Sequence, residues 1–152
     1  MKLIPRILIA TLILTWTINV SAQTPDELVK TFFSEYRSEG AAIALKKLYE
    51  TNNWISRNQD GINKLIGQLA SYNEELIGEY YGYEAITKKS LGESYVLMSY
   101  LVKFDRQPLR FTFQFYKPKD QWVLYSFKFD DSFDDELERA AEIYMLPESG
   151  GN

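Results

Sequence analysis

YVLMSYLVKF (residues 95–104), PLRFTFQFY (108–116) and WVLYSFKF (122–129) are three apolar runs separated by short turn sequences. In the second and third runs the side chains alternate between two sets. Such a period of two residues places one set on each face of a β-strand. Phe113 is therefore expected on a buried face and Gln114 on the opposite face. Consecutive strands joined by short turns predict an antiparallel meander.

Helical periodicity dominates the region before this meander. Thr24, Pro25 and Glu27 have the spacing of a capped helix start, and Gly40 is a typical helix stop. Apolar residues then recur at intervals of three and four residues, which is typical of helices with one buried face. We expect helices from Thr24 to Gly40, from Ala41 to Tyr49 and from about Gln59 to Tyr72.

A further strand and a further helix complete the predicted fold. Residues 76–87 favour a strand, and Gly82 inside this segment indicates a bulge or a strong bend. A final helix is expected from Asp131 or Ser132 to about Met145. The chain is therefore predicted to be an α+β protein. Its N-terminal helices would pack on a curved, four-stranded, mostly antiparallel sheet, with a short C-terminal helix. Residues 23–147 are expected to form one domain, followed by a flexible tail at residues 148–152.

The first 22 residues have the features of a secretory signal peptide. Lys2 and Arg6 form a charged region that precedes the apolar segment Ile7–Val20. Val20-Ser21-Ala22 then has small residues at the positions that signal peptidase recognises. The alternative is a membrane anchor, but this segment contains polar residues and is shorter than the roughly 20 apolar residues of a spanning helix. We expect cleavage after Ala22 and a periplasmic or secreted bacterial protein without a stable membrane anchor.

Composition narrows the possible classes of function. The chain has 152 residues and contains neither histidine nor cysteine. These absences exclude histidine-based triads, cysteine nucleophiles and the usual zinc sites. Without residues 1–22 the chain has 15 basic and 21 acidic residues, a net charge of −6. This acidic balance disfavours nucleic acid and anionic membranes as partners. No cofactor is expected.

The order of the predicted elements is similar to that of a known superfamily. The features that carry the resemblance are the helix Leu28–Tyr36, Trp54, the bent strand around Gly82-Tyr83, and the hairpin from Phe111 to Val123. Over nearly all of residues 23–147, the chain resembles the nuclear-transport-factor-2-like superfamily of cystatin-like folds, and in particular its small exported members of unassigned function. This resemblance implies a sheet that curls around the helices and leaves a conical cavity.

The same resemblance implies several kinds of activity rather than one, because a fold does not determine a function. Some relatives are enzymes, such as ketosteroid isomerases and polyketide cyclases, and many others only bind ligands or partners. The enzymes use an Asp base with Tyr or acidic donors, or an Asp–His pair, and the second arrangement is impossible in a chain without histidine. No catalytic position of these enzymes matches a residue here, so no catalytic residue is predicted.

The interior of the expected cone is a candidate ligand site. Alternation directs several aromatic residues of the strands to one face, and helical spacing turns Tyr36 towards them. A wall of rings with a few hydroxyl groups suits a small apolar ligand that carries one or two polar groups. The alternative is that the same side chains fill the core. The predicted lining residues are Tyr36, Trp54, Tyr83, Met98, Tyr100, Phe113 and Tyr125.

The opposite face of the sheet is a candidate interface, because a large and partly apolar surface usually marks a contact with a partner. Relatives often form homodimers through this face. The alternative is that the C-terminal helix covers it through Leu137, Ala141 and Tyr144. The predicted interface residues are Tyr95, Leu97, Leu101, Tyr116, Trp122 and Leu124.

Carboxylates offer two further hypotheses. A buried carboxyl group with a raised pKa could act as a general base, whereas a solvated carboxylate beside a turn is ordinary. The acidic cluster from Asp130 to Glu136 could attract calcium, but it does not match the EF-hand pattern. Acidic residues also stabilise the first turn of a helix, and no metal site is predicted. The candidate bases are Glu79, Glu84, Glu93, Asp105 and Asp130.

These observations lead to one main functional hypothesis and two alternatives. The main hypothesis is an exported small domain that binds an apolar ligand or a protein partner without catalysis. The first alternative is an isomerase-like or cyclase-like enzyme that uses Asp or Glu with Tyr in the cone. The second is a structural subunit of the bacterial envelope that acts only through the face of its sheet.

Overall fold

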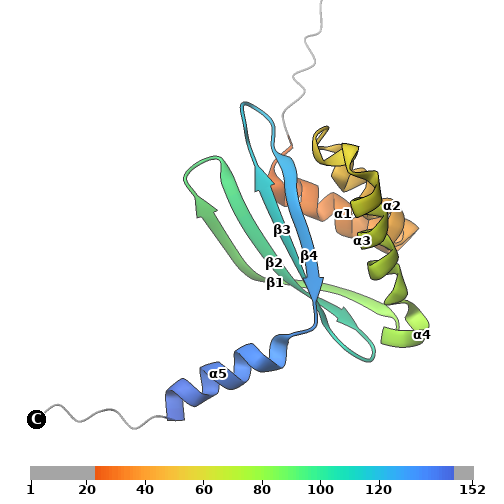
Figure 1. Ribbon diagram of the computed structural model, residues 1–152. Coiled ribbons are helices and arrows are strands. Elements are labelled where there is room, and N and C mark those ends of the chain that lie inside the picture. Colours follow the sequence, from red (N-terminus) through yellow and green to blue (C-terminus); the bar gives the residue numbers. More distant parts are fainter. Residues whose placement is uncertain (1–22, 146–152) are drawn as a thin grey trace, which may run out of the picture.

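The structure is a computed structural model that describes residues 23–145 (Figure 1). The predicted signal peptide at residues 1–22 and the predicted tail at residues 148–152 lie outside the described residues. In chain order, the elements are α1 (Pro25–Glu39), α2 (Ala41–Glu50), the 3-10 turn η1 (Ile55–Arg57), α3 (Gln59–Ser71), α4 (Glu74–Ile77), β1 (Tyr80–Leu91), β2 (Tyr95–Phe104), β3 (Leu109–Tyr116), β4 (Val123–Asp130) and α5 (Phe133–Met145).

The strands form one antiparallel sheet in the order β1-β2-β3-β4. Met98 of β2 pairs with Phe113 of β3, which in turn pairs with Phe127 of β4. Directly opposite residues point to the same face of a sheet, so these side chains form one row. Figure 1 shows α1, α2 and α3 on one side of the sheet. We call this side the inner face and the other the outer face. The predicted α+β architecture is confirmed.

The helix starts follow the sequence signals. The Thr24 hydroxyl accepts a hydrogen bond from the Glu27 N–H, and the Glu27 carboxylate accepts one from the Thr24 N–H at 2.7 Å, which completes a capping box. Gly40 ends α1 with φ at 87°, a left-handed conformation that favours glycine. Asn58 caps α3 through its side chain. Among residues 23–145, no helix has the length and apolar character needed to cross a membrane.

Aromatic side chains of α1 join this helix to the sheet. The ring of Phe32 lies 5.1 Å from that of Phe113 and 5.8 Å from that of Phe127, centroid to centroid. Phe33 contacts Phe113, Tyr100 and Tyr83. α2 packs against α1 and α3 against α2. The core therefore lies between the inner face and α1, and the expected inward facing of Phe113 is confirmed.

A β-bulge in β4 reverses the expected facing of two residues. Gln114 pairs with Ser126, but Phe115 pairs with Leu124, so Tyr125 is an extra residue in β4. Alternation consequently shifts by one position. Leu124, expected on the outer face, is fully buried, and Tyr125, expected in the interior, is 54% exposed. The expectations for both residues are therefore wrong, and one bulge explains both errors.

Polar side chains after α2 hold this bulged part of β4. The N–H of Leu124 donates to the Thr51 hydroxyl at 3.0 Å, and its carbonyl oxygen accepts from the Asn52 side-chain amide at 2.7 Å. A neighbouring strand would use its backbone N–H and C=O groups to make the same two bonds. The side chains of Thr51 and Asn52 thus replace a fifth strand at this point of the sheet edge.

The first strand begins later than expected and bends twice. Residues 74–77, partly assigned to a strand from the sequence, form the short helix α4, because the Asn73 side chain caps it by accepting from the Leu76 N–H at 3.0 Å. The pairing of β1 with β2 shifts between Tyr80 and Gly82 and again between Ala85 and Thr87. The predicted irregularity at Gly82 is present. β1 then continues through Lys88 and Lys89 to Leu91, beyond the expected end of this strand at residue 87.

The C-terminal helix does not cover the outer face. Figure 1 shows α5 leading away from the sheet, and Leu137, one of the residues expected to cover that face, is 68% exposed. The side chain of Tyr144 lies outside the described residues. The first turn of α5 contacts the outer face: Glu136 pairs with Arg110 at 2.6 Å, and the guanidinium group of Arg110 lies 5.4 Å from the centre of the Phe133 ring.

Candidate functional site

The space between the inner face of the sheet and α1, where the cavity was expected, is filled by side chains. The side chains of Met98, Tyr100 and Phe113 are buried. The rings of Phe32 and Phe33 occupy the space between these strand residues and α1, at the distances of close aromatic contacts. Close packing, which was the alternative to a cavity, therefore describes this part of the molecule.

The other residues predicted to line the interior lie apart from one another. Trp54 is 77% exposed, and the guanidinium group of Arg57 lies 4.6 Å from its ring centre, so its expected place in the interior is wrong. Tyr83 stacks on Phe33 near the edge of the sheet. Tyr125 lies on the outer face, where its ring is 5.7 Å from that of Tyr95. Tyr36 lines an open groove, described below.

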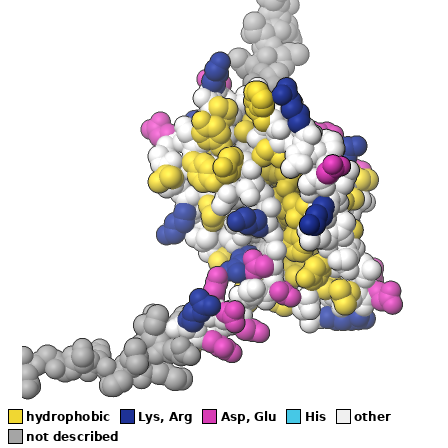
Figure 2. Space-filling model, viewed as in Figure 1, with side chains coloured by type: hydrophobic (Ala, Val, Ile, Leu, Met, Phe, Trp, Pro, Cys, Tyr) yellow, Lys and Arg dark blue, Asp and Glu magenta, His cyan; other side chains and the backbone are white. Residues whose placement is uncertain are grey.

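The outer face carries a cluster of exposed and half-buried apolar and aromatic residues, which we call the aromatic patch. The register places Leu91 beside Tyr95 and Tyr95 beside Tyr116. Leu97 follows on the same face of β2, and the bulge adds Tyr125. The space-filling view in Figure 2 shows hydrophobic side chains gathered over the upper part of the molecule. The patch therefore comprises Leu91, Tyr95, Leu97, Tyr116 and Tyr125.

The predicted interface residues have three different placements. Tyr95, Leu97 and Tyr116 belong to the aromatic patch, and the Tyr95 hydroxyl donates to the Gln114 side chain at 3.0 Å. Leu101 is half-buried on the outer face nearer to the charged end of the sheet. Trp122 is half-buried against the core, below the Lys117 ammonium group. Leu124 belongs to the core.

The opposite end of the outer face is charged. Arg110 forms hydrogen bonds with both carboxylate oxygens of Asp130, the shortest at 2.6 Å, and also pairs with Glu136. Partial burial raises the pKa of Asp130, but the hydrogen bonds from Arg110 and from the Ser132 N–H outweigh it and hold that pKa below its ordinary value. Such a carboxylate stays ionised near neutral pH, and Arg110 already occupies it.

The remaining candidate bases are solvated. Glu79, Glu84, Glu93 and Asp105 are all exposed. Glu84 pairs with Lys103 at 2.6 Å, and Asp105 accepts from the Tyr81 hydroxyl at 3.4 Å. Among residues 23–145, no group of three acidic side chains is arranged to hold a metal ion. In the acidic cluster, Asp130 and Glu136 therefore pair with Arg110. The acidic residues in the first turn of α5 stabilise the start of this helix.

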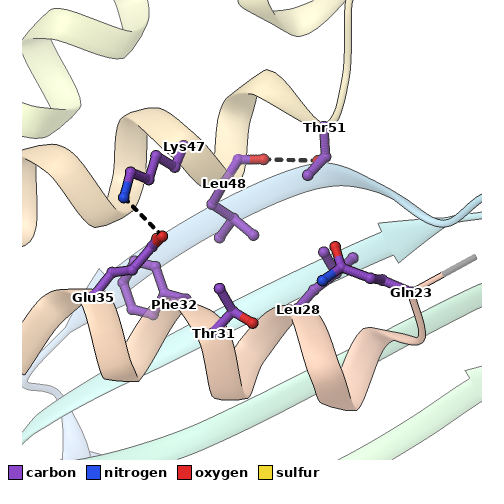
Figure 3. A pocket seen from close by; sticks show the side chains of 8 residues that line it. All are labelled: Gln23, Leu28, Thr31, Phe32, Glu35, Lys47, Leu48 and Thr51. Carbon is purple, nitrogen blue, oxygen red and sulfur yellow. Dashed lines mark hydrogen bonds and ion pairs between the residues drawn. The ribbon is translucent and has the colours of Figure 1, made fainter.

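A small crevice separates α1 from α2 (Figure 3). Its volume is about 80 Å³, which suits a few water molecules rather than an organic ligand. At one end Lys47 pairs with Glu35 at 3.0 Å, which raises the pKa of Lys47 above its ordinary value. At the other end the Thr51 hydroxyl donates to the Leu48 carbonyl oxygen at 2.7 Å. The Lys47–Glu35 ion pair thus links α2 to α1, and the Thr51 hydroxyl caps the end of α2 (Figure 3).

Sequence patterns missed two residues of the aromatic patch. Leu91 was not among the predicted interface residues, because the strand was expected to end at residue 87, and Tyr125 was expected in the interior. The single sign of the bulge in the sequence is the unequal spacing of core residues in β4, where Leu124 and Phe127 are three positions apart. Comparisons with models of known families, with curated proteins and with solved structures found no match for this chain.

Proposed function

We propose that this chain is a non-catalytic interaction subunit of the bacterial envelope, which pairs with a second copy of itself through the aromatic patch. The observation that carries this proposal is the patch itself, with Leu91 at 77%, Tyr125 at 54% and Tyr116 at 42% exposure. Contiguous exposed apolar surface usually marks an interaction site. Tyrosine is also enriched at interfaces, because its ring is apolar and its hydroxyl can hydrogen bond.

The filled interior supports an interaction role over the binding of an apolar ligand in the cone. Phe113 is fully buried and Phe32 contacts it, so a ligand there would have to displace well-packed rings. Removing such contacts typically costs several kcal/mol, about 3–5 for a buried Phe. The outer face requires no such displacement.

Charge distribution supports a second copy as the partner. The whole chain has a net charge of −4, so two copies repel each other in most relative orientations. The five residues of the aromatic patch carry no charge. Two copies can therefore meet there without placing like charges in contact. A two-fold arrangement uses the same patch on both subunits, which is the commonest symmetry of soluble oligomers.

We also propose that the fold belongs to the nuclear-transport-factor-2-like superfamily and that the protein is exported. The support for the first is the order of helices, bent strand and antiparallel meander. The support for the second is the sequence of residues 1–22. N-terminal sequencing of the protein from its own cells tests export: Gln23 as the first residue agrees with it, and a retained Met1 contradicts it.

Sedimentation equilibrium of the purified chain tests the pairing. The parent protein should sediment as a dimer, and Tyr125→Ser should shift it towards monomer. Tyr81→Ser is a matched control, because Tyr81 is exposed to the same extent, 55% against 54%, but lies on β1 outside the patch. A monomeric parent at high concentration, or an equal response to both substitutions, would overturn the proposal.

A further inference from the structure

An open groove lies where the ends of several elements meet, on the helix side of the molecule. We call it the mouth groove, and its volume is about 410 Å³. This size is within the range of pockets that bind small molecules. Its residues come from the end of α1, the start of α2, the end of α3, α4 and its flanks, and the β1 and β2 strands. They are Tyr36, Glu39, Gly40, Ala41, Ala42, Leu69, Ala70, Tyr72, Asn73, Glu74, Gly78, Tyr80 and Phe104.

Three aromatic rings lie together in the mouth groove. The rings of Tyr36 and Tyr80 are 5.3 Å apart, those of Tyr80 and Phe104 are 5.7 Å apart, and those of Tyr36 and Phe104 are 6.4 Å apart. Tyr72 adds a fourth ring to the lining. Aromatic surface of this kind can hold an apolar body and can also attract a cation to the ring faces.

The charged residues of the lining have a single sign. Of the lining residues only Glu39 and Glu74 are charged, and both are acidic. Glu39 lies 3.5 Å from the Lys47 ammonium group, which is closer to Glu35 at 3.0 Å, so the charge of Glu39 is only partly compensated. The start of α2 contributes about half a positive charge. Among the lining residues, the Glu74 carboxylate and the uncompensated part of the Glu39 charge outweigh it, so the lining favours cations. Arg37, which is not a lining residue, already places its guanidinium group 5.2 Å from the centre of the Tyr80 ring.

Small residues keep the mouth groove open. Ala41, Ala42 and Ala70 present only methyl groups, and Gly40 and Gly78 present none. At Gly78 the φ angle is 86°, and an added Cβ would lie 2.4 Å from the Cβ of Asp105. Both the backbone conformation and the close approach of Asp105 therefore require glycine at this position.

We propose that the mouth groove binds an organic ammonium ion. The apolar body of the ligand lies on the rings of Tyr36, Tyr80 and Phe104, and its charged nitrogen lies near Glu39 and Glu74. The Tyr36 side chain adds a neutral hydroxyl group to the lining. This site is separate from the aromatic patch, and the inference does not rest on the proposed pairing.

Titration with a matched pair of probes tests this inference. Benzyltrimethylammonium and phenylacetate share an aromatic ring but carry opposite charges. NMR spectra of the full folded chain should show saturable shifts of the Ala41, Ala42 and Ala70 amide signals with the ammonium probe. Phenylacetate should shift them little, and added salt should weaken the binding of the ammonium probe.

Three variants make the test specific. Glu39→Gln combined with Glu74→Gln should weaken binding about tenfold, because two exposed ion pairs are each worth up to about 1 kcal/mol. Glu50→Gln is the control, since Glu50 is an exposed acid of α2 that does not line the groove, and it should leave affinity unchanged. Ala70→Trp should fill the groove and abolish binding. Equal shifts with both probes, or unchanged affinity in the double variant, would overturn the inference.

Discussion

The rings of Phe33 and Tyr83 stack face to face, with centroids 3.7 Å apart and planes 11° apart. Phe33 is a buried residue of α1, and Tyr83 lies on β1, the strand at one edge of the sheet. The stack therefore fastens this edge strand to the first helix. A second link lies further along the same strand, where Lys88 pairs with Asp26 at 2.6 Å.

The stack should be measurable as a coupling between the two residues. In a double-mutant cycle with Phe33→Leu and Tyr83→Leu, the coupling free energy should be about 0.5–1.5 kcal/mol, the usual range for an aromatic pair. Urea unfolding of the parent, both single variants and the double variant provides the four values. Strictly additive losses would mean that the rings do not stabilise each other.

The bulge in β4 predicts opposite tolerance at two adjacent positions. Leu124→Ala should destabilise the protein by about 2–5 kcal/mol, because it removes a fully buried side chain. Tyr125→Ala should cost less than about 1 kcal/mol, because the ring is at the surface. Thermal unfolding monitored by circular dichroism measures both. If Tyr125→Ala destabilised the protein more than Leu124→Ala, alternation along β4 would be regular and the bulge would be contradicted.

On β3, which has no bulge, we expect a similar contrast in stability between two adjacent positions. Phe113→Ala should cost about 3–5 kcal/mol, since its ring is surrounded by Phe32, Tyr100 and Phe127. Gln114→Ala removes only a half-buried side chain that accepts a bond from Tyr95, and should cost about 1 kcal/mol. Denaturant midpoints of the two variants decide the facing, and comparable losses would contradict it.

Alkaline pH should destabilise the protein through its buried tyrosines. Burial, with a smaller effect of Tyr80, raises the pKa of Tyr36 from 10.0 to about 12. Between these values the unfolded chain loses the Tyr36 proton while the folded chain keeps it, so stability is full below pH 10 and falls as the pH rises towards 12. Each pKa unit corresponds to about 1.4 kcal/mol.

Tyr36→Phe should remove this part of the alkaline loss, because phenylalanine has no proton to release. Tyr100, with a pKa also raised to about 12 by burial, Asp26 and Tyr83, should account for a further part. Urea unfolding at intervals from pH 8 to pH 12 gives the profiles. The surface variant Tyr125→Phe is the control. A Tyr36→Phe profile parallel to that of the parent would disprove the role of this hydroxyl.

Sequence patterns predicted most of the framework for identifiable physical reasons. The capping box at Thr24 and the stop at Gly40 depend only on neighbouring residues, so they are readable locally. Alternation along β2 and β3 is uninterrupted, and the facing of Phe113 follows from it. In β4 alternation fails at the extra residue Tyr125. The bonds that hold the neighbouring Leu124 come from Thr51 and Asn52, more than seventy positions away in the sequence, so local alternation does not reveal them.

The candidate sites were less accessible to sequence reasoning. The mouth groove is lined by residues from the ends of helices and from two strands. The periodicity of apolar residues predicts the buried face of each element, but it does not predict how the ends of different elements are arranged. Trp54 was expected to line the interior. In the folded chain it borders a 3-10 turn, where Arg57 stacks on it at the surface. The aromatic patch was partly predicted, through Tyr95, Leu97 and Tyr116, because these residues lie on strands with regular alternation.

The two edges of the sheet are closed in different ways, with a consequence for assembly. Along β1 the pairing is interrupted twice and the strand carries Lys88 and Lys89, features that discourage another strand from adding to an edge. On β4, side chains of Thr51 and Asn52 already occupy the backbone groups of Leu124. These features disfavour edge-to-edge growth into fibres at both edges. The proposed pairing uses the face of the sheet instead, where a two-fold pair would close on itself and leave no free patch for a third copy.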